Sequence, residues 1–183
     1  MKLALRGSES ALAAALNEAR RAQPTITLDR GSPAHHFHEV QVRVRLGEGD
    51  NCFAAARGEV MTFSMHRRSG LAVLASEPVA RPGVDVISAL SVGLLMVLVP
   101  CRVLEIWDEG DRAGFSYVTL PGHPEIGVEA FVVERAADDS VWFSISAISR
   151  PASIVTVLAG PVGRAIQRLA TDRYVAAMQD ACS

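Results

Sequence analysis

The chemically richest stretch of the sequence is TLPGHPEIGVE, which runs from Thr119 to Glu129. A simple connection between strands needs only about two to five residues, so this longer segment calls for a reason of its own. His123 lies between Gly122 and Pro124, and a histidine can transfer protons near neutral pH while a carboxylate orients its ring. The segment therefore predicts an acid/base residue, His123, at the rim of a site, with Glu125 or Glu129 orienting it. The alternative is a stiff loop in which His123 bonds nearby backbone.

Two hydroxyl side chains precede this loop. Tyr117 and Thr119 alternate with other residues on the same predicted strand face as Phe115. A buried hydroxyl without a partner costs about 1–3 kcal/mol, so each one needs a hydrogen bond. A ligand carbonyl or hydroxyl can supply it, with Tyr117 as the donor to the ligand. A backbone group or a water molecule would serve equally well.

Basic residues occur at two further predicted element ends. The run His66–Arg68 closes a predicted helix, where cations complement the helix dipole. An arginine there could instead bind a carboxylate or phosphate. Arg150, before Pro151, leaves the same choice open, with pairing to an acid such as Glu129 or Glu134 as its structural role.

The sequence favours neither a metal nor a cofactor. His35, His36 and His38 lie close together, but only His36 and His38 share a strand face, and neither cysteines nor acids stand at a recognised ligand spacing. Phosphate-loop, dinucleotide-binding and G-x-S-x-G patterns do not occur. We therefore expect no cofactor and no metal.

Bulk properties narrow the class of protein. The 183 residues suggest one domain, 1–183, and the formal net charge of −2 excludes a general nucleic-acid binder. The start lacks a secretory pattern, so a cytoplasmic location is expected. The three cysteines, Cys52, Cys101 and Cys182, follow no zinc or disulfide spacing. We expect three free thiols in a reducing environment, two as small buried core residues and one near the C-terminus.

Periodicity predicts the elements that must position these residues. Ser8 or Ser10 caps a helix that ends near Arg21, and helical spacing returns from Phe53 to Phe63. Apolar alternation and turn residues predict strands at 25–28, 40–46, 72–75, 84–90, 94–107, 112–119, 128–134 and 141–149.

The longest uncharged run, VISALSVGLLMVLVPC, lies between Asp85 and Arg102. Its sixteen residues are fewer than the roughly twenty that a spanning helix needs, so two buried strands joined near Ser91–Gly93 are expected and no transmembrane segment is.

A long amphipathic helix is predicted from Ser153 to about Asp180, with a kink or break after Gly160 because Pro161 lacks a backbone donor. Arg164, Arg168 and Arg173 lie largely outside the apolar stripe of this helix. They form either a solvated face or a surface that contacts an anionic membrane.

This order of elements predicts an α+β fold. A curved antiparallel sheet would pack around the long C-terminal helix in a helix-grip-like arrangement, with a short helix at the N-terminus. An open sheet with helices on one face is the alternative.

Three segments carry a resemblance to a known family. They are LGEGDNCFAAARGEVMTFSMHRRSGL, VPCRVLEIWDEGDRAGFSYVTLPGHPEIGVEAFVVE and VWFSISAISRPASIVTVLAGPVGRAIQRLATDRYVAAM. They are similar to the family known as domain of unknown function 1990, over about residues 40–178, while residues 1–39 diverge. The resemblance implies a fold of the helix-grip type, which START and Bet v 1 proteins share, and it implies no established reaction.

The chain departs from the family pattern at two positions that bear on a site. Ser64 stands where the family usually has tryptophan, and Val128 replaces the first acid of a G-E-E run whose second acid is kept as Glu129. A smaller residue at 64 would enlarge a cavity lined by that helix.

Three functional hypotheses follow. The first is binding of a hydrophobic or amphipathic metabolite (a lipid, isoprenoid or polyketide) between the sheet and the C-terminal helix. The second is a cofactor-free cyclase, isomerase or dehydratase in natural-product biosynthesis that uses the same cavity. The third is a non-catalytic membrane-surface or protein-interaction module, and a homodimer is left open. Ligand contacts are expected from Phe63, Ser64, His66, Phe115, Thr119, Trp142 and Arg150.

Overall fold

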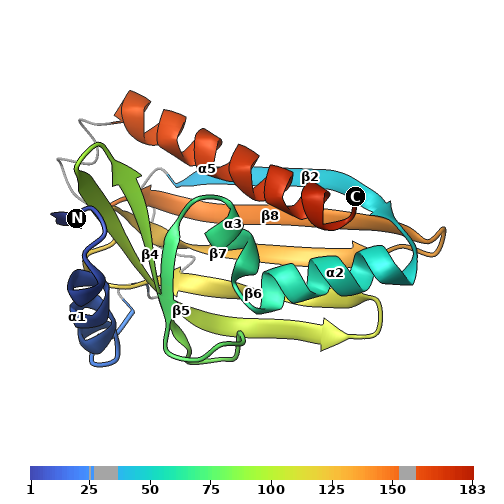
Figure 1. Ribbon diagram of the computed structural model, residues 1–183, viewed down its shortest axis with the longest axis horizontal. Coiled ribbons are helices and arrows are strands. Elements are labelled where there is room, and N and C mark those ends of the chain that lie inside the picture. Colours follow the sequence, from blue (N-terminus) through green and yellow to red (C-terminus); the bar gives the residue numbers. More distant parts are fainter. Residues whose placement is uncertain (25, 27–36, 153–159) are drawn as a thin grey trace.

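An eight-stranded antiparallel sheet forms the body of the protein (Figure 1). The structure is a computed structural model that describes residues 1–24, 26, 37–152 and 160–183, with only the course of the helix from 160 to 167. The strands are β1 (Lys2–Leu5), β2 (His38–Glu48), β3 (Ala72–Ala75), β4 (Asp85–Val92), β5 (Leu95–Glu109), β6 (Arg112–Thr119), β7 (Glu125–Arg135) and β8 (Ser140–Pro151). Their order is β2-β8-β7-β6-β5-β4-β3, and β1 pairs with β5 outside this path.

Short turns between alternating apolar runs produce this antiparallel order. Gly93, with φ 62°, lies in the turn between β4 and β5, where the uncharged run folds back on itself. Asp139, with φ 67°, lies in the turn between β7 and β8. The two hairpins expected in these regions are confirmed. The N-terminal strand β1 was missed, and the strand expected at 25–28 lies outside the described residues.

Helices cover both faces of the sheet. Three of them, α2 (Gly49–Met61), α3 (Ser64–Arg68) and α5 (Gly160–Ala181), lie over one face, which we call the inner face, while α1 (Glu9–Ala19) packs against the other (Figure 1). The alternation of side chains along each strand separates the two cores. Val86 of β4 belongs to the inner core and its neighbour Ile87 to the α1 side. The α+β class with a curved antiparallel sheet around a C-terminal helix is confirmed.

A backbone break at Phe63 divides the expected helix of this region into α2 and α3. Phe63 adopts a left-handed conformation, with φ 59° and ψ 16°, although its ring is fully buried. A non-glycine residue in this conformation is uncommon and is held by its surroundings. The break turns the chain so that Phe63 and His66 both contact Phe115 on the inner face.

The C-terminal helix begins later than expected. Pro161 is the second residue of α5, a place where a missing N–H leaves no hydrogen bond unmade. The proline therefore lies at the start of the described helix and does not interrupt it, while residues 153–159 of the expected helix lie outside the described part of the chain.

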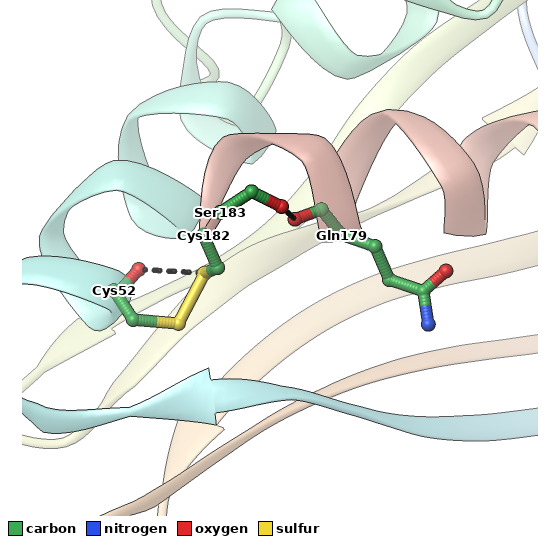
Figure 2. The surroundings of a disulfide bond; sticks show 4 residues. All are labelled: Cys52, Gln179, Cys182 and Ser183. Carbon is green, nitrogen blue, oxygen red and sulfur yellow. Dashed lines mark hydrogen bonds between the residues drawn. A yellow bond between two sulfur atoms is a disulfide. The ribbon is translucent and has the colours of Figure 1, made fainter.

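A disulfide joins the far end of α5 to the start of α2. Cys52 and Cys182 are bonded, with 4.8 Å between their Cα atoms and a sequence separation of 130 (Figure 2). The expectation of three free thiols is therefore wrong. The cysteine spacing gave no sign of this pair because only the packing of α5 beside α2 brings the two residues together. Cys101 is a buried free thiol.

Candidate functional site

Polarity increases along the inner face of strands β6 and β7. The register pairs Phe115 with Phe131, then Tyr117 with Glu129, and all four side chains face the helices. The next position on β6 is Thr119, whose hydroxyl accepts a hydrogen bond from the Gly127 backbone at 3.1 Å. An aromatic core thus passes, within one strand, into a row of hydrogen-bonding groups.

Tyr117 and Glu129 form a direct pair at this transition. The Tyr117 hydroxyl donates a hydrogen bond of 2.8 Å to Glu129 Oε2. Burial raises the pKa of Glu129 to about 7, the hydrogen bond from Tyr117 opposes that shift, and the negative charge of Glu125 adds to it. A carboxyl group that changes its protonation state near neutral pH therefore lies inside the protein, although part of the residue remains accessible to solvent.

His66 approaches the same pair from α3. It is fully buried, and neither ring nitrogen has a hydrogen-bond partner. Its ring centroid lies 5.0 Å from those of Phe131 and Tyr174 and 6.3 Å from that of Tyr117. Burial lowers the pKa of His66 to about 3, so the imidazole is neutral and offers one N–H donor and one acceptor nitrogen.

Two further residues complete the group. Tyr174 of α5 covers His66 and Phe131, and Cys101 of β5 lies near enough for the charge of Glu129 to act on both residues. Burial first, and then the charge of Glu129, raise the pKa of the Cys101 thiol and of the Tyr174 phenol well above their usual values. We call His66, Cys101, Tyr117, Glu129 and Tyr174 the polar cluster.

Sequence reasoning did not place Cys101 or Tyr174 in the site. Cys101 ends the uncharged run and was interpreted as a core residue. Tyr174 belongs to the long helix, where nothing local distinguishes it from other buried positions. The one feature that could have identified Tyr174 is its position on the apolar side of that helix, where Tyr174, Ala177 and Met178 are buried together.

His123 lies in the loop after β6, and its side chain bonds the backbone of that same loop. His123 Nδ1 accepts a hydrogen bond of 2.8 Å from the Glu125 N–H. Although part of the residue remains accessible to solvent, burial is the largest effect on its pKa, which falls to about 4. The Glu125 carboxylate accepts a hydrogen bond of 2.7 Å from Ser149 on β8. The contacts of the loop are therefore those of the stiff-loop alternative.

Three residues expected to touch a ligand have other contacts. The Ser64 hydroxyl bonds that of Thr62 at 2.7 Å. Trp142 lies opposite to its buried neighbours on β8, with the Arg43 guanidinium 4.4 Å from its ring centroid. Arg150 shares that outer face and lies 6.0 Å from the ring of Phe37. Phe63, by contrast, packs in the aromatic wall beside His66 and Phe115.

The described residues bear on two of the expectations, those about a metal site and a membrane span. Within them, His, Cys, Asp and Glu side chains do not gather in groups of three or more that could hold a metal ion. His38 begins β2, and His35 and His36 lie outside the described residues. In the described part of the chain, no helix combines the length and apolar character needed to cross a bilayer.

Hollows among the described residues occur on the α1 side of the sheet. One of about 170 Å³ lies between α1, β5 and the Pro121–Gly122 turn, and a more open one of about 370 Å³ lies between α1 and β1. Both are lined mainly by alanine and aliphatic carbon, with the ion pair of Lys2 and Glu18 in each. Neither has the titratable chemistry of the polar cluster.

The polar cluster can therefore do two things. A neutral imidazole whose two nitrogens have no hydrogen-bond partner has the chemistry to bond a hydroxyl or carbonyl group. A carboxyl group with a pKa near 7 can accept or release a proton at physiological pH. The aromatic walls would exclude water from either event.

Comparisons with known proteins agree on the fold. The family described as "Domain of unknown function (DUF1990)" matches residues 22–177, which extends further toward the N-terminus than the expected 40–178. A UPF0548 protein of Deinococcus radiodurans is 36% identical over 146 residues, or 72% of each chain.

Solved structures with low sequence identity share the architecture. A hypothetical protein of Helicobacter pylori, jhp0584, superposes with a TM-score of 0.60 at 13% identity and covers 88% of this chain and all of its own. Protein NE0264 of Nitrosomonas europaea gives a TM-score of 0.52 at 10% identity, with 78% of this chain and 92% of its own covered.

Proposed function

Because the chain belongs to the DUF1990 family, whose description assigns no activity, we propose a function from the site itself: binding of one amphipathic small molecule on the inner face of the sheet. The polar end of the ligand, a carbonyl or hydroxyl group, would bond His66 and Glu129. Its apolar body would lie along the inner face toward Thr119. Lipid, isoprenoid and polyketide metabolites have this chemistry.

The observation that carries this proposal is the state of His66. Buried polar atoms in proteins are almost always hydrogen-bonded, and leaving one unpaired costs about 1–3 kcal/mol. His66 leaves two such atoms unpaired, at a position that phenylalanine or leucine could fill without that cost. A ligand oxygen that accepts a hydrogen bond from one nitrogen, or a ligand hydroxyl that donates one to the other, would remove the cost at that nitrogen. The same bond would fix the orientation of the ligand.

Native mass spectrometry of protein purified from its own host, without detergent, tests the proposal. We expect the wild type to retain a noncovalent small molecule and to bind a fluorescent naphthyl ketone, which has an apolar body and one carbonyl. His66→Phe should weaken binding of the ketone by about tenfold, the value of one hydrogen bond.

The matched control is Trp142→Phe on the outer face, which should bind the ketone like the wild type. Circular dichroism establishes that both variants are folded. If His66→Phe binds as tightly as the wild type, the imidazole does not hold the ligand.

The pKa of Glu129 favours acid/base catalysis as a second candidate function. In the ionised form, Glu129 could take a proton from a carbon next to a ligand carbonyl, and the electron pair of that C–H bond would enter an enolate. The His66 N–H would donate to the enolate oxygen. Return of a proton from Glu129 to a different carbon, before or after that proton exchanges with solvent, completes an isomerisation that needs no co-reactant.

In this mechanism Glu129 takes the acid/base role that the sequence suggested for His123. Nuclear magnetic resonance in D₂O with a simple β,γ-unsaturated ketone measures the proton abstraction directly. We expect Glu129→Gln to lower the exchange rate by about a hundredfold or more, whereas His123→Ala keeps it. Loss of exchange in His123→Ala alone would return the role to the loop.

A further inference from the structure

Exposed aliphatic side chains gather at the end of the sheet where β1 meets the β4–β5 hairpin. Leu94 is 82% exposed, Leu5 69%, Leu3 52%, Val92 51% and Leu95 43%. We call these five residues the leucine tip. Single exposed leucines are ordinary in soluble proteins, but a contiguous group marks a surface that meets something apolar.

The strand register makes the leucine tip one continuous patch. Leu95 is paired with Leu5 of β1 on one side and with Val92 of β4 on the other, so the three side chains share a face. The Arg6 N–H donates a hydrogen bond of 2.9 Å to the Leu94 carbonyl, which fixes the end of β1 beside the hairpin turn. The patch is therefore held by backbone pairing from three segments.

The patch lies on the same face of the sheet as the polar cluster. Along β5, Cys101 belongs to the inner core, and Val99, two residues back, packs against that core. Alternation continues through Val97 to Leu95, with exposure rising toward the end of the strand. A molecule that leaves the polar cluster along β5 would thus reach the leucine tip.

Charge indicates what the leucine tip meets. The run from Val86 to Cys101, which includes the whole hairpin turn, holds no charged residue. The charged side chains of β1 and the residue after it are both basic: Lys2 pairs with Glu18, and Arg6, next to Leu5, is exposed. Two copies meeting tip to tip would bring their Arg6 residues together, whereas an anionic lipid surface would attract them.

We propose that the leucine tip inserts into the interfacial region of a membrane that contains anionic lipids, with Arg6 at the level of the headgroups. Apolar side chains beside a basic residue are the combination that interfacial binding uses. This surface differs from the arginine face of α5 that the sequence suggested. The proposal does not depend on the ligand, since membrane binding is measurable on ligand-free protein.

Flotation with phosphatidylcholine vesicles containing phosphatidylglycerol tests this proposal. The wild type should float, and should float less as the phosphatidylglycerol fraction falls or the salt concentration rises. Leu94→Ser should lower the partition coefficient by about tenfold, as expected for one leucine side chain withheld from the apolar phase. Arg6→Ala should lower it by about fivefold and remove most of the salt dependence.

Ile148→Ser is the matched control, because Ile148 is 52% exposed on β8, outside the leucine tip. This variant should float like the wild type. Leu94→Trp adds a local readout, since its fluorescence should be quenched by brominated lipids. Absence of flotation, or equal loss in the Ile148 variant, overturns the proposal. A wild-type dimer in light scattering that Leu94→Ser dissociates, without vesicle binding, assigns the tip to a second copy instead.

Discussion

Tyr117 and Glu129 lie opposite each other on β6 and β7, and a 2.8 Å hydrogen bond joins the phenol to the carboxylate inside the inner core. The pair holds a carboxyl group of pKa about 7, and its Tyr117 ring lies 6.3 Å from the ring of His66, a fully buried imidazole without a hydrogen-bond partner. Neither a buried carboxyl group nor a buried imidazole without a partner adds to the stability of a hydrophobic core. Both are typical of functional sites, where local stability is given up for chemistry.

Glu129→Gln should change how stability depends on pH. The folded-state pKa of Glu129 is raised, so its favourable contribution is complete below the unfolded value near 4.5 and is lost as pH rises to about 7. The shift corresponds to a difference of up to about 3 kcal/mol between pH 4.5 and 7.5. Urea unfolding of both proteins across this pH range measures the effect, as the free energy of unfolding of the wild type minus that of the variant. A difference that stays constant with pH would contradict the raised pKa.

His66→Phe should stabilise the protein, by about 1–3 kcal/mol at pH 7, because it removes two unpaired buried nitrogens. The folded-state pKa of His66 is lowered to about 3, so the wild type loses stability as pH falls below the unfolded value of 6.5, and the advantage of the variant should grow there. Urea unfolding between pH 4 and 7 measures this. His66→Ala is the counterpart: it leaves a cavity, and a gain in stability there would show that packing around His66 is loose.

Gly127→Ala should be strongly destabilising. A Cβ atom at Gly127 would lie 2.3 Å from the Ile148 carbonyl oxygen and 2.6 Å from the Ser149 Cβ, so β7 and β8 would have to separate. We expect a loss of more than about 2 kcal/mol in the free energy of unfolding. Gly58→Ala is the control, since open space surrounds that position in α2 and alanine should add about 0.5–1 kcal/mol. Thermal unfolding compares the two, and equal effects would refute the close approach.

Reduction of the Cys52–Cys182 bond should lower stability. The chain-entropy model gives roughly 5 kcal/mol for a loop of this length, and measured losses are about 2–5 kcal/mol. Urea unfolding with and without reductant measures the effect, and Cys52→Ser/Cys182→Ser should be insensitive to reductant. Cys101 should stay unreactive toward thiol reagents until the protein unfolds, since it is buried and its pKa is raised. Intact-mass measurement of three free thiols, in place of the one expected, in the non-reduced wild type would count against the bond.

The sequence by itself determined the local structure of this protein. Alternation with a period of two is a property of neighbouring residues, so it was enough to predict β6, β7 and β8 and to group Phe115, Tyr117 and Thr119 on one face. Turn residues fixed the hairpins for the same reason, and the family resemblance supported the α+β fold with its C-terminal helix.

Only the tertiary structure decided which distant residues meet. His66 reaches Tyr117 and Tyr174 because the chain breaks at Phe63 and because α5 packs across α3, and neither event has a local pattern. The same packing of α5 pairs Cys52 with Cys182. His123, the most conspicuous residue in the sequence, bonds to its own loop, where its ring accepts a hydrogen bond from the backbone N–H of Glu125. Residue type indicates what chemistry a side chain can perform, but its pKa and its partners depend on contacts that only the folded chain creates.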